Sequence, residues 1–112
     1  MLEQYREVAP QGTVEVLRQL GHRVEGKSML HVNSTRFGGG VAEILHRLLP
    51  LFEELGVKIR WEVLAGSDLF YRTTKSFHNA LQGTKQRITS EMYDAFLECN
   101  RKNAKQLNLD AE

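Results

Sequence analysis

The chain is 112 residues long, with 15 basic against 14 acidic residues and a single cysteine. This length accommodates at most one domain with a modest core, and the formal net charge of +1 argues against a nucleic-acid surface driven by bulk charge. One cysteine excludes an internal disulfide framework, and no apolar run matches a signal peptide or is long enough to span a membrane. We therefore expect a soluble cytoplasmic protein that binds neither nucleic acid nor membrane.

The first third of the chain predicts one helix and one strand. Residues 1–11 are mixed and polar, and their pattern leaves open whether they pack or stay loose. Thr13 can cap a helix that Gly21 is placed to end, with apolar residues at helical spacing between them. Residues 28–33 have high β propensity. We expect His31 in this strand to be packed rather than catalytic, because nothing nearby completes a dyad or a metal set.

Three consecutive glycines follow the strand through a polar turn, Gly38, Gly39 and Gly40. Without a Cβ they let another group approach the backbone closely, and the helix beginning at Val41 points free N–H groups and a positive dipole end at the gap. A phosphate, a carboxylate or a sugar hydroxyl would suit this place. The same glycines can equally form only a tight turn, since GGG matches neither the dinucleotide fingerprint nor the P-loop.

Three polar residues border the glycines and are candidate ligand contacts. Ser34 and Thr35 stand at the carboxyl end of the strand, which borders the ligand crevice in open α/β sheets, and they can bind a ligand or cap the turn. Glu43 lies in the first helical turn, where it can complement the helix dipole or accept a hydrogen bond from a sugar hydroxyl. Little is inferred for Arg36, within the turn.

The helix after the glycines carries a stripe predicted to face the core. Its members are Val41, Ile44, Leu45, Leu48, Phe52 and Leu55. Pro50 cannot donate to the carbonyl of His46, so we expect a kink or break there, and we expect His46 and Arg47 to be solvated. Alternation over residues 57–64 predicts a second strand parallel to the first, with Trp61 in the core rather than serving as a platform for a sugar ring.

A third helix is predicted between Ser67, a capping residue, and Gly83. Lys75, His78 and Asn79 share one face of it, because they are three and four positions apart. Such a cluster can bind a hydroxyl-rich or anionic ligand, and it can equally be an ordinary solvated face.

A fourth helix is predicted after Thr89, and Cys99 on its apolar stripe is interpreted as a small core residue. The chain then ends without another predicted strand. Two strands are few for a doubly wound domain. The sequence therefore predicts the first part of a larger α/β domain, a partial Rossmann-like βαβ arrangement with a parallel sheet and helices.

Two stretches give the chain a family resemblance. They are HVNST followed two residues later by GGGVAE, and TKSFHNALQG. Together they resemble the N-terminal part of the glycosyltransferring trehalose synthases and of the trehalose phosphorylases, which are retaining enzymes among the family 4 glycosyltransferases. The resemblance extends from about Tyr5 to Asn103.

This resemblance implies the GT-B architecture, with two Rossmann-like domains facing across a cleft, and residues 1–112 as the N-terminal portion of the first. In such enzymes a glucosyl group passes from nucleotide diphosphate glucose to glucose, forming the α,α-1,1 linkage with retention and without a metal. The loop Gly38–Gly40 would face the donor diphosphate and the sugars. The implied sugar-binding residues are Ser34, Thr35, Glu43, Lys75, His78 and Asn79. No catalytic residue, metal ligand or cofactor is assigned to this chain.

Three hypotheses remain at this point. The first is an acceptor-side fragment of a trehalose-forming glycosyltransferase, of synthase or phosphorylase type, that is inactive alone because the donor-binding domain is absent. The second is an interaction or assembly module that forms a homodimer through an open sheet edge. The third, an independent nucleotide-binding protein, is the weakest, because the loop lacks both common nucleotide fingerprints.

Overall fold

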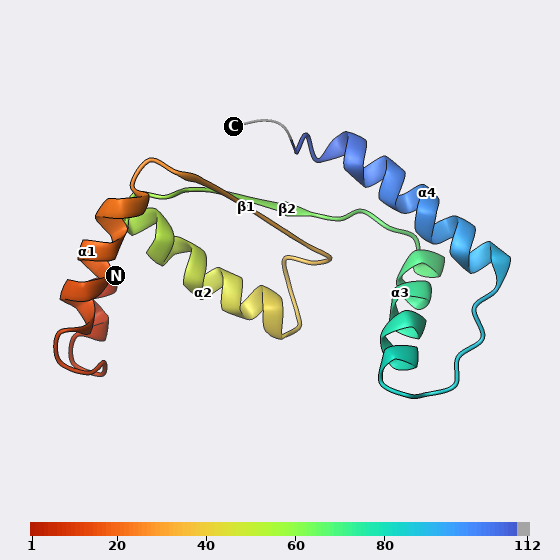
Figure 1. The fold of residues 1–112 in the computed structure, drawn as a ribbon, viewed down its shortest axis with the longest axis horizontal. Helices are drawn as coiled ribbons and strands as arrows, with labels where there is room; N and C mark the ends of the chain where they lie inside the picture. The colour runs from red at the N-terminus through yellow and green to blue at the C-terminus, as the bar shows by residue number, and fades with distance from the viewer. Residues whose placement is uncertain (110–112) are drawn as a thin grey trace. The chain divides into compact units, whose positions relative to one another are not determined.

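The structure is a computed structural model that describes residues 1–109, and Figure 1 shows its helices and strands. These described residues form one 3-10 helix, four α-helices and two strands. Their bounds are η1 Leu2–Tyr5, α1 Thr13–Val24, β1 Ser28–Asn33, α2 Gly40–Glu54, β2 Lys58–Val63, α3 Asp68–Leu81 and α4 Ser90–Gln106. The fold is α/β, as predicted, and is divided into two compact units, Met1–Val63 and the residues from Leu64 onward.

The first unit is built around β1 and β2, which pair in parallel as predicted. The register places Ser28 opposite Lys58 and Asn33 opposite Val63. Helix α2 connects the two strands, which makes β1–α2–β2 a βαβ unit consistent with a partial Rossmann-like domain. Because the strands run the same way, both carboxyl ends lie at one edge of the sheet, where the loop to α2 begins.

Helix α2 corrects two predictions. It runs from Gly40 to Glu54 with Pro50 inside it, so of the predicted kink or break the break is wrong. Pro50 has no N–H to donate to the carbonyl of His46, and His46 is an exposed residue. The buried face matches the predicted stripe only in part: Leu45 is buried, but so are Ala42 and Leu49, whereas Val41, Ile44 and Leu48 are 61%, 60% and 38% exposed. Apolar residues surround much of this helix, so periodicity alone could not tell which face meets the sheet.

The N-terminal segment of the first unit is folded against its neighbours. Leu2 in η1 is 2% exposed, and its backbone N–H donates to a carboxylate oxygen of Glu54 at 2.9 Å. Helix α1 continues through Gly21 to Val24, so the predicted stop is wrong. Gly21 has a packing role rather than a helix-ending role, because a Cβ at this position would lie 2.9 Å from Cδ2 of Leu55. The cap is Gly12, with φ of 87°, rather than Thr13.

The second unit pairs α3 with α4. Phe70 is buried and stacks on Phe96 with ring centroids 6.1 Å apart, and Phe77 meets Phe96 edge-on at 5.1 Å. The predicted caps are confirmed, since the Ser67 side chain accepts the Phe70 N–H and the Thr89 side chain accepts the Met92 N–H. Aromatic packing and side-chain caps therefore define this unit.

Candidate functional site

The glycine loop joins the carboxyl end of β1 to the start of α2, as Figure 1 shows. Gly38 and Gly39 have φ of 76° and 82°, a region that side-chain-bearing residues rarely adopt. Gly39 combines this φ with ψ of 154°, a conformation almost confined to glycine. Gly40 does not have a positive φ, and a Cβ at any of the three positions would meet nothing within 4 Å. The loop is therefore surrounded by open space.

The start of α2 has no side-chain cap. The Glu43 N–H donates to the Gly39 carbonyl at 3.3 Å, which begins the helical ladder. The backbone N–H groups of the first turn precede that bond and carry the positive end of the helix dipole. This end of α2 can therefore accept negative charge or hydroxyl oxygens from outside the loop.

The predicted residues beside the loop have different roles in the structure. The Thr35 hydroxyl donates to the Phe37 carbonyl at 2.6 Å and accepts the Phe37 N–H at 3.1 Å, so it shapes the turn. Ser34 is exposed. Glu43 is also exposed, and it lines an open depression of about 880 Å³ on α2 together with Gly40 and Arg47. Ser34 and Glu43 thus remain available to a ligand.

Three residues for which no ligand role was predicted surround the entry to the loop. Arg36 donates from Nη2 to the Trp61 carbonyl at 2.6 Å, and its guanidinium lies 5.0 Å from the centre of the Trp61 ring. His46 contacts Trp61 and the Arg36 carbonyl, so it is not simply solvated. Trp61 is half-buried rather than enclosed in a core. The only local signal was a basic and an aromatic residue directly before the glycines.

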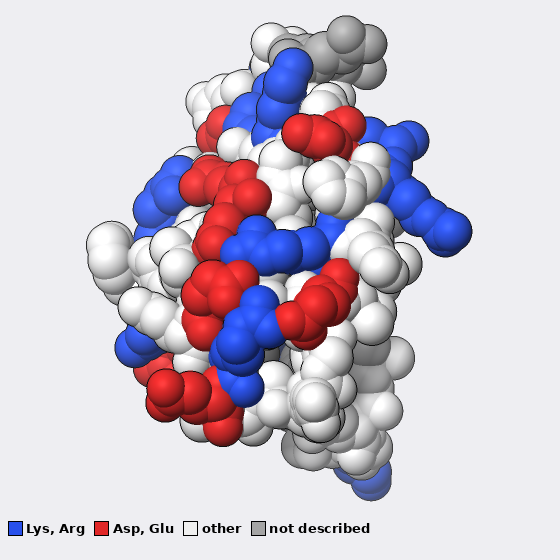
Figure 2. Space-filling view, turned by 90° about the vertical axis from the view of Figure 1, so that its left-hand side faces the viewer, with Lys and Arg blue, Asp and Glu red and all other residues white. Residues whose placement is uncertain are grey.

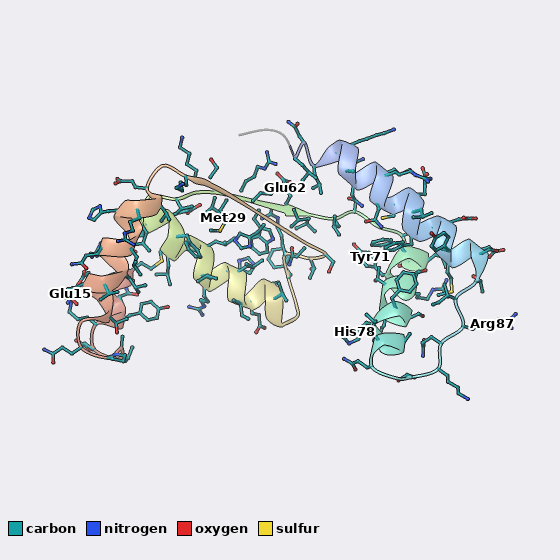
Figure 3. The ribbon with its side chains drawn as sticks, in the orientation of Figure 1. Glu15, Met29, Glu62, Tyr71, His78 and Arg87 are labelled. Carbon is teal, nitrogen blue, oxygen red and sulfur yellow. The ribbon has the colours of Figure 1, made fainter. Side chains whose placement is uncertain are left out.

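The second predicted cluster lies on α3, in the other unit. Lys75 and His78 are exposed and Asn79 is half-buried. Nε2 of His78, labelled in Figure 3, lies 3.0 Å from Nε2 of Gln82, and the Asn79 carbonyl accepts the N–H of Thr84 at 3.0 Å. These side chains are placed on one helix, as predicted, near its C-terminal end. The glycine loop belongs to the first unit and this cluster to the second.

The strongest electrostatic contacts lie away from the loop. Arg6 and Arg18 donate hydrogen bonds to Glu3 and lower the pKa of that carboxyl to about 2, and Arg6 likewise lowers the pKa of Glu15. Figure 2 shows side chains of both signs intermixed on the face it displays. Within residues 1–109 no three His, Cys, Asp or Glu side chains gather as a metal site would require. None of the helices described is long and apolar enough to cross a membrane.

Comparison with known proteins identifies the family. The family model described as "Trehalose synthase, N-terminal domain" matches residues 31–112. This chain belongs to that family. Among its relatives, the trehalose synthase of Thermococcus litoralis is 50% identical over 109 residues, which is 96% of this chain and 26% of the relative. The trehalose synthase of Rubrobacter xylanophilus is 41% identical over 106 residues, or 95% of this chain and 26% of the relative.

The trehalose phosphorylase of Pleurotus pulmonarius is a more distant relative, 38% identical over 100 residues, which is 85% of this chain and 14% of the relative. The family predicted from the two motifs is therefore confirmed. The chain spans about a quarter of the length of the trehalose synthases it matches.

Proposed function

We propose that this chain forms the glycine-loop side of a glycosyltransferase that makes trehalose from nucleotide diphosphate glucose and glucose, within the GT-B architecture. In this proposal the chain contributes binding groups rather than a catalytic residue, and alone it transfers no glucose. Membership of the trehalose synthase N-terminal domain family supports the assignment, as does the position of the loop at the carboxyl end of parallel strands.

The observation that carries the proposal is Gly40. A glycine is explained within a fold when its φ is positive or when a Cβ would collide with a neighbour, and Gly40 meets neither condition among the described residues. At a helix start without a side-chain cap, it costs the helix stability relative to alanine. Close approach of an external group to the backbone accounts for its presence.

The chemistry of the loop suits a diphosphate and a sugar. The N–H groups at the start of α2 would stabilise the negative charge of the donor diphosphate through hydrogen bonds and the helix dipole. The Glu43 carboxylate would repel a phosphate but accept a hydrogen bond from a sugar hydroxyl, to which the Ser34 hydroxyl can also bond. We propose Lys75, His78 and Asn79 as acceptor-side contacts because they offer two donors and an amide on one face of α3.

A chimera tests this function directly. This chain replaces the matching quarter of the Thermococcus litoralis trehalose synthase, and trehalose formation is measured from nucleotide diphosphate glucose and glucose. We expect transfer by the parent chimera and decreasing transfer in Gly40→Ala and Gly40→Leu, because a larger side chain obstructs the ligand. Ser90→Ala, at the first position of α4, is the matched control. A Gly40→Leu chimera as fast as the parent, or trehalose made by the 112-residue chain alone, contradicts the proposal.

The phosphorylase alternative predicts a different ligand for the same loop. It is favoured by the 38% identity to the Pleurotus pulmonarius trehalose phosphorylase. Amide NMR titrations of the isolated chain with UDP-glucose, ADP-glucose and glucose 1-phosphate distinguish the two. Shifts at residues 38–43 with a nucleotide sugar support the synthase assignment, whereas shifts with glucose 1-phosphate alone support the phosphorylase.

A homodimeric assembly module is the second candidate. The outward stripe of α2 leaves Val41 and Ile44 about 60% exposed, and in the described residues β1 and β2 pair only with each other. Unpaired strand edges and exposed apolar side chains favour association. Sedimentation equilibrium of the isolated chain tests this, with Ile44→Glu as the dissociating variant. A monodisperse monomer contradicts the dimer.

A further inference from the structure

Arg36, directly before the glycine loop, is fastened to two different elements. Its side chain reaches β2, where Nη2 donates to the Trp61 carbonyl at 2.6 Å and the guanidinium lies 5.0 Å from the ring centre. Its backbone carbonyl is bound by Nε2 of His46 on α2, also at 2.6 Å. The chain is therefore attached to the strand and to the helix just before it enters the three glycines.

His46 is fixed in both orientation and tautomer. A carbonyl oxygen only accepts hydrogen bonds, so the Nε2 atom that contacts Arg36 must carry a hydrogen. The imidazole ring also lies 5.7 Å from the Phe37 ring and meets the Trp61 ring edge-on at 4.9 Å. These ring contacts favour a single rotamer, which keeps the donor directed at the loop.

Trp61 extends this connection to the end of β1. Its Nε1–H donates to Oδ1 of Asn33 at 2.8 Å, and the Asn33 amide donates in turn to the Thr35 carbonyl at 2.7 Å. The turn before the glycines is thus held by side chains from β1, α2 and β2. A Cβ on any of the three glycines would meet nothing within 4 Å, so the side chains that order the loop are those at its entry.

We propose that Arg36, His46 and Trp61 are positioning residues that hold the glycine loop in the conformation its ligand requires. The effect on ligand affinity rests on the proposed function. The order of the loop itself can be measured without any ligand. Pre-organisation raises affinity because less conformational freedom is lost on binding. If an unfastened loop occupies the competent conformation a tenth of the time, ligand affinity falls about tenfold.

Backbone relaxation NMR of the ligand-free chain is the first measurement. We expect order parameters of the Gly38–Gly40 amides near 0.85 in the parent and below about 0.6 in His46→Leu and Arg36→Ala. His46→Gln should restore order, because its amide can donate from nearly the same position as Nε2. Arg47→Ala, the neighbouring exposed residue of α2, is the matched control. Chemical shifts of β1 and β2 report whether each variant retains the sheet.

Trp61 supplies a second, spectroscopic signature because it is the only tryptophan in the chain. Losing the Arg36 or His46 contact uncovers its ring, so acrylamide should quench its fluorescence more strongly in Arg36→Ala and His46→Leu. His46→Gln tests the hydrogen bond separately, since it lacks the aromatic ring. An ordered loop in both loss variants, or a His46→Gln loop as mobile as that of His46→Leu, overturns the proposal.

Titration of the same variants with UDP-glucose and ADP-glucose then tests the consequence for affinity. We expect the dissociation constant to rise about tenfold when the loop is unfastened. A loosened loop with unchanged affinity overturns the positioning role. If the parent binds neither nucleotide sugar, the proposed function fails, while the order parameters still decide whether these residues hold the loop.

Discussion

Two strand-to-helix turns in this chain differ in how their helices begin. The first, residues 34–39, leads from β1 to α2, and the second, residues 64–67, leads from β2 to α3. Both contain glycine. In the second turn a side chain of the chain itself caps the helix start, whereas in the first turn no side chain caps the start of α2.

In the second turn, the Ser67 hydroxyl and the backbone groups of Ala65 have partners, and the glycine has a packing reason. The Ser67 hydroxyl caps α3 by accepting the Phe70 N–H at 3.2 Å. The Asn103 side chain accepts the Ala65 N–H at 2.9 Å and donates to the Ala65 carbonyl at 2.8 Å. A Cβ on Gly66 would lie 2.5 Å from Cδ1 of buried Phe70. Contacts within the folded chain therefore account for Ser67, Ala65 and Gly66 in this turn.

In the first turn, contacts within the chain and backbone conformation account for the residues up to Gly39. Side chains hold residues 33–37, and positive φ angles account for Gly38 and Gly39. Neither explanation applies to Gly40 or to the uncapped start of α2. The contrast distinguishes a glycine with a packing role, Gly66, from Gly40, for which a side chain would meet open space.

The largest predicted effect follows from substituting Asn103, whose side chain binds the backbone of the second turn. Asn103→Leu removes the acceptor of the Ala65 N–H and leaves the Ala65 carbonyl with only the weak Cys99 thiol donor at 3.1 Å, in a site where Asn103 is 4% exposed. We expect the free energy of unfolding to fall by up to about 3 kcal/mol, because one group left without its partner in a partly buried site costs about 1–3 kcal/mol. Urea unfolding measures it. Asn100→Leu, at an exposed position of α4, is the control and should change stability by less than about 0.5 kcal/mol; equal losses would refute the difference.

Gly39 and Gly40 should respond oppositely to the same substitution. Gly39→Ala forces a side chain into a glycine-only conformation and should lower the free energy of unfolding by about 1–3 kcal/mol. Gly40→Ala adds a methyl group in open space and should leave stability within about 0.5 kcal/mol, or raise it. Thermal unfolding compares the two. If Gly40→Ala destabilises as much as Gly39→Ala, Gly40 has a folding role and no longer points to a ligand.

Local sequence signals predicted the elements well and their packing less well. The strand at residues 28–33 and the caps Ser67 and Thr89 were correct, because β propensity and capping depend on adjacent residues. The end of α1 was wrong because Gly21 accommodates Leu55, which is distant in sequence. The predicted buried stripe of α2 was right at Leu45 and wrong at Val41 and Ile44, because the buried face depends on which side the sheet covers.

The candidate site shows the same division. The glycines were recognisable because they are consecutive and lie between a strand and a helix. Arg36, His46 and Trp61 come from the turn, α2 and β2, and only the folded chain brings them together. No pattern in the sequence relates an arginine, a histidine ten residues later and a tryptophan in the next strand. Residues that lie on several elements and together shape a loop are thus harder to predict from sequence than the loop itself.

Capping provides a smaller test of the comparison. Ser67→Ala removes the acceptor for the Phe70 N–H and should lower the free energy of unfolding by about 1 kcal/mol. Ser34→Ala is its counterpart in the first turn, where no side chain caps the helix, and should change stability by less than about 0.5 kcal/mol. Urea unfolding of both variants measures the difference. A comparable loss in Ser34→Ala would show that the start of α2 is capped after all.

The smallest predicted effect concerns the charged cluster of the first unit, which lies outside both turns. Hydrogen bonds from Arg6 and Arg18 lower the pKa of Glu3 from 4.5 to about 2. Because the folded pKa is depressed, the contribution of Glu3 to stability is present above pH 4.5 and is lost as the pH falls through about 2. The Glu3 side chain is 52% exposed, and solvent screening keeps that contribution small.

A pH titration followed by the Glu3 carboxyl carbon in NMR checks this pKa. In Arg18→Ala one of the two donors is lost, so the midpoint should rise toward the ordinary glutamate value, and Arg6→Ala should act in the same direction. Arg47→Ala removes a cation that is not among the charges acting on Glu3 and should leave the midpoint unchanged. A parent midpoint near 4.5 would mean that these ion pairs do not persist in solution. The N-terminal segment would then rely on the burial of Leu2 and on the hydrogen bond from its N–H to the Glu54 carboxylate.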